Sequence, residues 1–171
     1  MASTLKINNL DTASGSTITI PTGKQLIVTD GGGVRVPGIV LQVLNMRTDG
    51  GRSTTSTSLV DTNLTLTITP KATSSKILVF ASMYEVYTGT TNTSAQFAIN
   101  RGGTIIGDHQ GATLYYAPAN QYGNVQIQYY DEPNTTSATE YKIQYKSNNG
   151  NQIQINGDNT QNHFMLMEIA G

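Results

Sequence analysis

Few side chains in this sequence are suited to acid–base or metal chemistry. The 171 residues include two histidines, His109 and His163, and no cysteine. His109 lies beside Asp108, but neighbouring side chains usually diverge, so the two do not form a catalytic dyad. His163 begins an apolar segment, where we expect a strand-end residue with a backbone partner. Without a third imidazole or a thiolate, the sequence specifies no zinc site.

A pair of carboxylates, Asp131 and Glu132, follows two tyrosines, Tyr129 and Tyr130. Most glycosidases place two carboxylates on either side of a glycosidic bond, and a tyrosine ring could stack against the sugar. Adjacent carboxylates are poorly placed to flank one bond, however, and Pro133 marks a turn directly after them. We therefore interpret the pair as a solvated turn.

Two further segments give weak signals for ligand binding. Residues 156–159 (NGDN) offer oxygen atoms but lack the spaced acidic ligands of a calcium loop. Residues 31–33 (GGG) are followed by neither a helical pattern nor a Lys-Ser/Thr pair, so they do not match a phosphate-binding loop. We predict that the protein is not an enzyme and holds no metal or cofactor.

Tyrosine is the main aromatic residue, with nine tyrosines, three phenylalanines and no tryptophan. Tyr115-Tyr116 and Tyr129-Tyr130 are adjacent pairs, so one ring of each pair must point away from the core of a strand. Such rings, together with Tyr122, predict either a surface that binds a glycan or protein, or a contact between subunits. The candidate receptor-binding residues are Tyr116, Tyr122 and Tyr130. The tyrosines expected in the core are Tyr129, Tyr141 and Tyr145.

From about residue 39 onward, short apolar runs separated by turn residues indicate strands that would position these rings. No segment shows helical spacing for three turns. The expected strands are residues 39–46, 64–69, 76–87, 94–100, 104–106, 113–116, 124–130, 140–146, 151–156 and 163–169, with a weaker candidate at 54–60. This number and spacing predict an antiparallel β-sandwich, jelly-roll-like, over residues 38–171.

The expected strands are of two kinds. Most alternate apolar with polar residues, as expected for one face in a core and one in water. Residues 77–84 (ILVFASMY) and 164–169 (FMLMEI) are instead apolar on both faces. The second apolar face needs a cover, which is either a neighbouring subunit or loops of the same chain.

The N-terminal segment contains an internal repeat of eight residues. Cut at each glycine from Gly15, it reads GSTITIPT, GKQLIVTD and GGGVRVPG. The fourth and sixth places of each octad are apolar: Ile18, Ile20, Leu26, Val28, Val34 and Val36. One thin apolar stripe cannot fold alone, but several copies wound about a common axis would bury it. Residues 1–37 are therefore predicted to form a stalk of stacked octads in an intertwined homotrimer, the alternative being a flexible linker.

Composition narrows the classes of partner. Only 12% of the residues are charged and the formal net charge is −1. The chain therefore has no excess of positive charge that would attract nucleic acid. No segment reaches the ~20 apolar residues of a membrane span, and the start lacks a signal-peptide core. We expect the protein to be synthesised in the cytoplasm and not to insert into a membrane.

Two segments resemble a known family. Residues 2–43 (ASTLKINNLDTASGSTITIPTGKQLIVTDGGGVRVPGIVLQV) and 54–84 (TTSTSLVDTNLTLTITPKATSSKILVFASMY) are similar to small tail-fibre or fibre-like proteins of marine tailed bacteriophages. The resemblance covers about half of the chain and carries no catalytic residue. It implies a homotrimeric virion appendage that attaches to other virion proteins through its N-terminal segment and faces outward with its C-terminal part.

The sequence thus favours a virion structural protein, a trimeric tail fibre that contacts a host surface glycan or protein. Three alternatives remain: a capsid decoration or head-fibre protein, a free-standing glycan-binding (lectin-like) module, and an enzyme that cleaves polysaccharide. Attachment to the tail and attachment to the capsid both require only a trimeric N-terminal segment. The sequence therefore does not distinguish a tail fibre from a head fibre.

Overall fold

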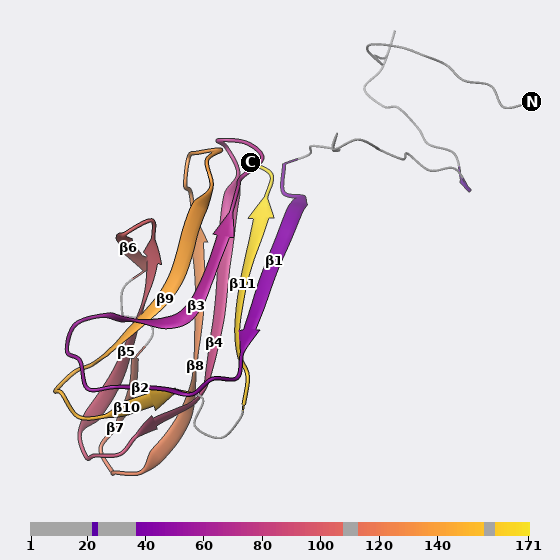
Figure 1. Ribbon diagram of the computed structural model, residues 1–171. Coiled ribbons are helices and arrows are strands. Elements are labelled where there is room, and N and C mark those ends of the chain that lie inside the picture. The colour runs from indigo at the N-terminus through magenta and orange to yellow at the C-terminus, as the bar shows by residue number, and fades with distance from the viewer. Residues whose placement is uncertain (1–21, 24–36, 108–112, 156–159) are drawn as a thin grey trace, which may run out of the picture. The chain divides into compact units, whose positions relative to one another are not determined.

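The computed structural model describes residues 22–23, 37–107, 113–155 and 160–171 (Figure 1). The chain divides into two units, Met1–Val34 and Arg35–Gly171, and the second contains all of the described strands. Within the described residues the chain is all-β, as predicted, with no helix. The candidate trimer-interface residues of the octads lie outside the described residues: Ile18, Ile20, Leu26, Val28, Val34 and Val36.

Sheet A has six strands built around the long strand β4. One edge of β4 pairs first with β11 and then, near the end of β4, with β10, while its other edge pairs with β8. Outside these, β1 pairs with β11 and β2 with β10. The strands are β1 (Val40–Thr48), β2 (Arg52–Thr54), β4 (Lys76–Thr88), β8 (Gln121–Asp131), β10 (Ile153–Ile155) and β11 (Asn162–Ile169).

Sheet B has five strands, four of them in the order β3-β9-β5-β6. The fifth strand, β7, pairs with the first part of β5, whereas β6 pairs with its last part. The strands are β3 (Val60–Ile68), β5 (Thr93–Arg101), β6 (Thr104–Gly107), β7 (Thr113–Tyr116) and β9 (Thr139–Ser147). All pairings in both sheets are antiparallel. The orders β1-β11-β4-β8 and β3-β9-β5-β7 are those of a jelly roll, in which each sheet alternates strands from the two halves of the chain.

The core lies between the inner faces of the two sheets. Val79, Met83 and Phe164 from sheet A are buried in one cluster with Phe97 and Ile143 from sheet B. Each lies on a strand that alternates inward and outward side chains, so the two-residue period of the sequence sets which residues meet. The rings of Phe97 and Tyr145 stack within this core at 6.1 Å and an interplanar angle of 18°.

All ten of the firmly expected strands are present, most of them with shifted ends, whereas β2 is not among the expected strands and the weaker candidate at 54–60 is wrong. β2 ends at Thr54 and β3 begins at Val60. Between them the Ser56 N–H donates to Thr54 Oγ1 at 3.0 Å, and the Ser58 N–H donates to Ser56 Oγ at 3.0 Å. Hydroxyl groups therefore take the backbone donors that a strand would use, and the segment turns.

The sandwich has a proximal end and a distal end. The proximal end is where β1 begins and β11 ends, with Val40 paired to Ile169. The distal end is where β4 ends and β8 begins, with Thr88 paired to Gln121. In Figure 1 the label C marks the proximal end, and β7, β2 and β10 lie toward the distal end.

Candidate functional site

At the proximal end, Asp131 joins the two sheets. Its carboxylate accepts two hydrogen bonds from Arg101 Nη1, at 2.7 and 2.9 Å, and one from the Tyr141 hydroxyl at 2.5 Å. Asp131 is 6% exposed and ends β8 of sheet A, whereas Arg101 and Tyr141 belong to sheet B. Burial raises the pKa of the Tyr141 hydroxyl, and the hydrogen bond to Asp131 raises it further.

The interpretation of Asp131 and Glu132 as a solvated turn is therefore wrong for Asp131. A buried carboxylate is stable here because a guanidinium and a phenol satisfy it. Glu132 is exposed and forms an ion pair with Lys76 at 2.9 Å. The two acids thus have different partners, and only Glu132 is exposed to solvent.

A second buried carboxylate closes the proximal end. Glu168 is fully buried near the end of β11. Its Oε1 accepts from the Lys71 N–H at 2.6 Å, and its Oε2 accepts from Gln42 Nε2 at 2.5 Å. Gln42 Nε2 also donates to the Thr69 carbonyl at 2.8 Å. These bonds fix the turn between β3 and β4 to the last strand of the chain.

The distal end presents a pair of aromatic rings. Tyr87 and Tyr122 are cross-strand partners on β4 and β8, and their ring centroids lie 4.8 Å apart with a 36° tilt. The Tyr87 hydroxyl donates to Asn120 Oδ1 at 2.6 Å. Tyr122 is 56% exposed. One ring is thus held by an amide and supports a second ring that faces solvent.

Two tyrosines of β7 hold the neighbouring loops at this end. The Tyr116 hydroxyl donates to the Tyr122 carbonyl at 2.8 Å, and the Tyr115 hydroxyl donates to Asn92 Oδ1 at 2.9 Å. Tyr116 passes directly over Gly123, where an added Cβ would collide with the hydroxyl. Glycine at 123 therefore allows the ring to lie against β8. We call Tyr87, Tyr116, Asn120 and Tyr122 the tyrosine surface.

Asparagine side chains stabilise the loops behind the tyrosine surface. Asn149 Nδ2 donates to the Asn92 carbonyl at 3.1 Å, and Asn151 Nδ2 donates to Thr93 Oγ1 at 3.1 Å. Asn92 and Asn120 both have positive φ, at 56°. Asparagine tolerates this left-handed conformation better than most residues, so it suits turns that also need side-chain hydrogen bonds.

The structure brings together two of the three candidate receptor-binding residues. Tyr116 and Tyr122 are in contact at the distal end, whereas Tyr130 lies near the other end of β8, paired with Leu78. Tyr130 is 53% exposed. Sequence reasoning missed Tyr87 and Asn120, because the pairing of β4 with β8 determines their position.

The remaining tyrosine expectations are confirmed except at Tyr129. Tyr141 and Tyr145 are buried in the core as predicted, and Tyr115 is exposed while Tyr116 is half-buried. Tyr129 is 36% exposed, so its placement in the core is wrong. It lies beside Gly107 of β6 at the open edge of the sandwich, where no strand closes over the ring among the described residues.

The structure describes one of the two histidines. His163 is exposed and meets the Tyr84 ring edge-on at 6.1 Å, while His109 and residues 156–159 lie outside the described part of the chain. No cluster of three or more histidine or acidic residues suited to a metal ion occurs in the described ranges. Nor does any helix there have the length and apolarity to cross a membrane.

Comparisons with known proteins give only distant likenesses. Neither the protein-family models nor the curated proteins contain a match to this sequence. Among solved structures, the C-terminal domain of EclA, a sugar-binding protein, is 14% identical with a TM-score of 0.36, over 84% of this chain and 86% of that one. Dimeric latent PorU from Porphyromonas gingivalis is 10% identical with a TM-score of 0.41, over 82% of this chain and 14% of that one. Likenesses at this level carry no inference about function.

Proposed function

We propose that this chain is a virion structural protein, a homotrimeric tail fibre that contacts the host surface with the distal end of its sandwich. Its N-terminal segment trimerises and attaches to other virion proteins. The octad repeat and the resemblance to fibre-like phage proteins support this assembly. The observation that carries the contact role is the tyrosine surface, which lies at the opposite end of the sandwich from the point where the N-terminal segment joins β1.

The tyrosine surface has the chemistry of a glycan-binding site. A sugar ring has an apolar face of C–H groups and a rim of hydroxyls. The exposed Tyr122 ring offers a flat apolar partner, and the neighbouring Asn120 amide can donate and accept hydrogen bonds. The Tyr87 contact and the Tyr116 bond to the Tyr122 backbone fix the ring in place, so little side-chain freedom is lost on binding.

A single surface of this kind would bind weakly. Stacking on one ring contributes about 1 kcal/mol by analogy with aromatic pairs. Three copies on one fibre and several fibres on one particle would multiply the apparent affinity through avidity. The same surface would serve the lectin-like alternative, which differs in that the protein would act free of a particle.

The test is adsorption by particles that carry Tyr87→Ala and Tyr122→Ala together. We expect normal particle yield and protein content, with slower adsorption to host cells. Tyr129→Ala is the matched control, because it removes a partly exposed tyrosine from the opposite part of β8. Adsorption at the parental rate by the double variant would contradict the contact role. Absence of the protein from purified particles would contradict the virion role itself.

A further inference from the structure

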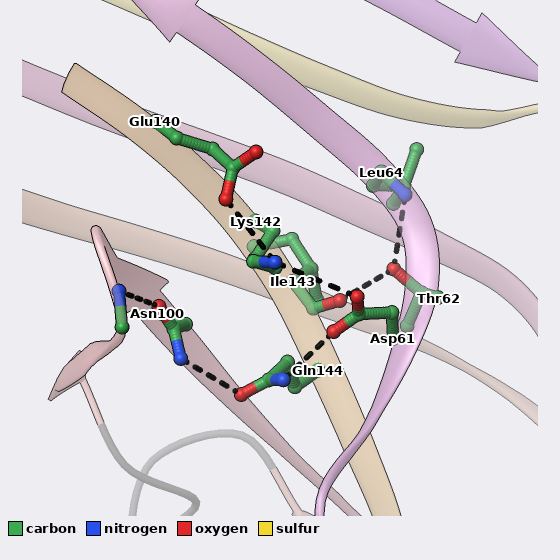
Figure 2. A network of polar contacts seen from close by, with 9 residues as sticks. Asp61, Thr62, Leu64, Asn100, Glu140, Lys142, Ile143 and Gln144 are labelled. Carbon is green, nitrogen blue, oxygen red and sulfur yellow. Dashed lines mark hydrogen bonds and ion pairs between the residues drawn. The ribbon is translucent and has the colours of Figure 1, made fainter.

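The outer faces of the two sheets differ in chemistry. On sheet B, Lys142 forms ion pairs with Glu140 at 3.1 Å and Asp61 at 3.6 Å. Gln144 Nε2 donates to Asp61 Oδ1 at 2.7 Å, and Asn100 Nδ2 donates to Gln144 Oε1 at 3.2 Å. Figure 2 shows these side chains linked across β3, β9 and β5. This face therefore carries a polar network whose two acids, Asp61 and Glu140, are 47% and 43% exposed.

The outer face of sheet A carries a cluster of apolar side chains in its proximal half. Cross-strand pairing aligns Val43, Met167, Leu78 and Tyr130 in one row across β1, β11, β4 and β8. The next row places Met165 beside Phe80, with the polar residues Asn45 and Gln128 on the two outer strands. We call the six apolar residues of these two rows the apolar face. Val43 is 45% exposed and Tyr130 53% exposed, and the other four side chains are half-buried.

An apolar area of this kind marks a contact surface in soluble proteins. It continues to the proximal edge, where the exposed Val40 pairs with Ile169. Methionines at two of the six positions add unbranched, adaptable side chains that pack well against a partner. Among the described residues, no strand of the chain lies over this face.

The chain's own connectivity points to the occupant. The apolar face begins on β1, and β1 directly follows the segment that carries the octad repeat. If that segment gathers three chains, it holds three apolar faces at high local concentration. A formal net charge of −1 with 12% charged residues opposes self-association only weakly.

We propose that the apolar face of each chain packs against other copies of the same chain. The inference rests on the proposed homotrimer and adds a second contact between chains, within the sandwich, to the one proposed for the octads. The polar face of sheet B and the tyrosine surface then remain outside the contact. Tyr130 is accordingly a residue between subunits and does not take part in receptor binding.

Two lysine substitutions test the proposal in the full-length chain. Val43→Lys with Tyr130→Lys puts two charges on the apolar face at positions already about half exposed, so the fold should tolerate them. Ile105→Lys with Thr67→Lys adds the same charge to exposed positions of sheet B. Sedimentation over a dilution series should show the half-dissociation concentration of the trimer rising by about a hundredfold or more for the first pair, and hardly at all for the second.

Methionine oxidation by peroxide gives an independent measurement on the unaltered protein. Met165 and Met167 should oxidise several-fold more slowly in the trimer than in chains dissociated by Val28→Asp, while the core residue Met83 stays protected in both. A wild-type chain that sediments as a monomer would overturn the proposed trimer and this inference with it. A stable trimer whose Met165 and Met167 oxidise at the dissociated rate, and which tolerates the apolar-face lysines, would overturn the inference alone.

Discussion

The two ends of the sandwich use polar groups in opposite ways. At the proximal end, Asp131 and Glu168 are buried carboxylates whose hydrogen bonds are directed inward, to Arg101, Tyr141, Lys71 and Gln42. At the distal end, phenols and amides bond to one another and leave the Tyr122 ring exposed. The proximal end therefore contributes stability, and the distal end presents a surface. Substitutions at the two ends should separate these contributions.

The largest effect on stability is expected from Asp131→Ala. The substitution leaves Arg101 and the buried Tyr141 hydroxyl without their shared partner, and breaking such a pair costs about 3 kcal/mol of unfolding free energy. Glu132→Ala, one residue further on, removes an ion pair that is exposed to solvent and should cost far less. Urea unfolding followed by tyrosine fluorescence measures both. Equal costs would show that the proximal end is not stabilised by Asp131.

Removing the second buried acid should have a somewhat smaller effect. Glu168→Leu deletes the acceptor of the Lys71 N–H and of Gln42, which costs about 2 kcal/mol. Glu168→Gln keeps one acceptor oxygen and should lose less. The same unfolding experiment ranks the two variants, and a Glu168→Leu protein as stable as wild type would contradict the role given to this side chain.

Tyr141→Phe should cost about 1 kcal/mol at neutral pH, through loss of the hydrogen bond to Asp131. Burial raises the pKa of Tyr141 in the folded state above its ordinary value of about 10. The neutral phenol therefore stabilises the fold fully below about pH 10, and this contribution is lost as the pH rises further. Unfolding curves at rising alkaline pH should show the gap between wild type and Tyr141→Phe closing. A constant gap would contradict this linkage.

At the distal end, Tyr116→Phe should cost less than about 1 kcal/mol, because the lost hydrogen bond to the Tyr122 carbonyl is exposed to water. Its main effect should be on the position of Tyr122. Glycan or cell binding should therefore weaken in Tyr116→Phe while the melting temperature changes little. A variant that binds as wild type would show that Tyr116 does not position the surface.

The smallest effect on stability is expected from Tyr122→Ala, within about 0.5 kcal/mol, since more than half of the side chain is exposed. This variant should separate stability from binding most clearly, because we expect unchanged unfolding together with the largest loss of binding. A clear loss of stability would show that Tyr122 is a structural residue. The distal end would then contribute to stability as the proximal end does.

The sequence predicted every described strand except β2, and the core apart from Tyr129, because a two-residue period is a local signal. β4 and β11 were identifiable as apolar on both faces from residues 77–84 and 164–169 alone. The Asp131 cluster was not predictable, since its three members lie on β8, β5 and β9 and meet only through the folding of the two sheets. The Tyr87–Tyr122 pair likewise depends on the register of β4 against β8, which includes an irregularity between Met83 and Val86.

The proposed homotrimer assembles through its octads, and the mass of the protein in solution tests this assembly. Light scattering on the purified full-length protein at micromolar concentration should give three times the 18.3 kDa of one chain. Val28→Asp should lower that mass by placing a charge on the shared apolar axis, and Thr19→Asp, on the other side of the repeat, should not. A mass of one chain for the unaltered protein would contradict the proposed homotrimer.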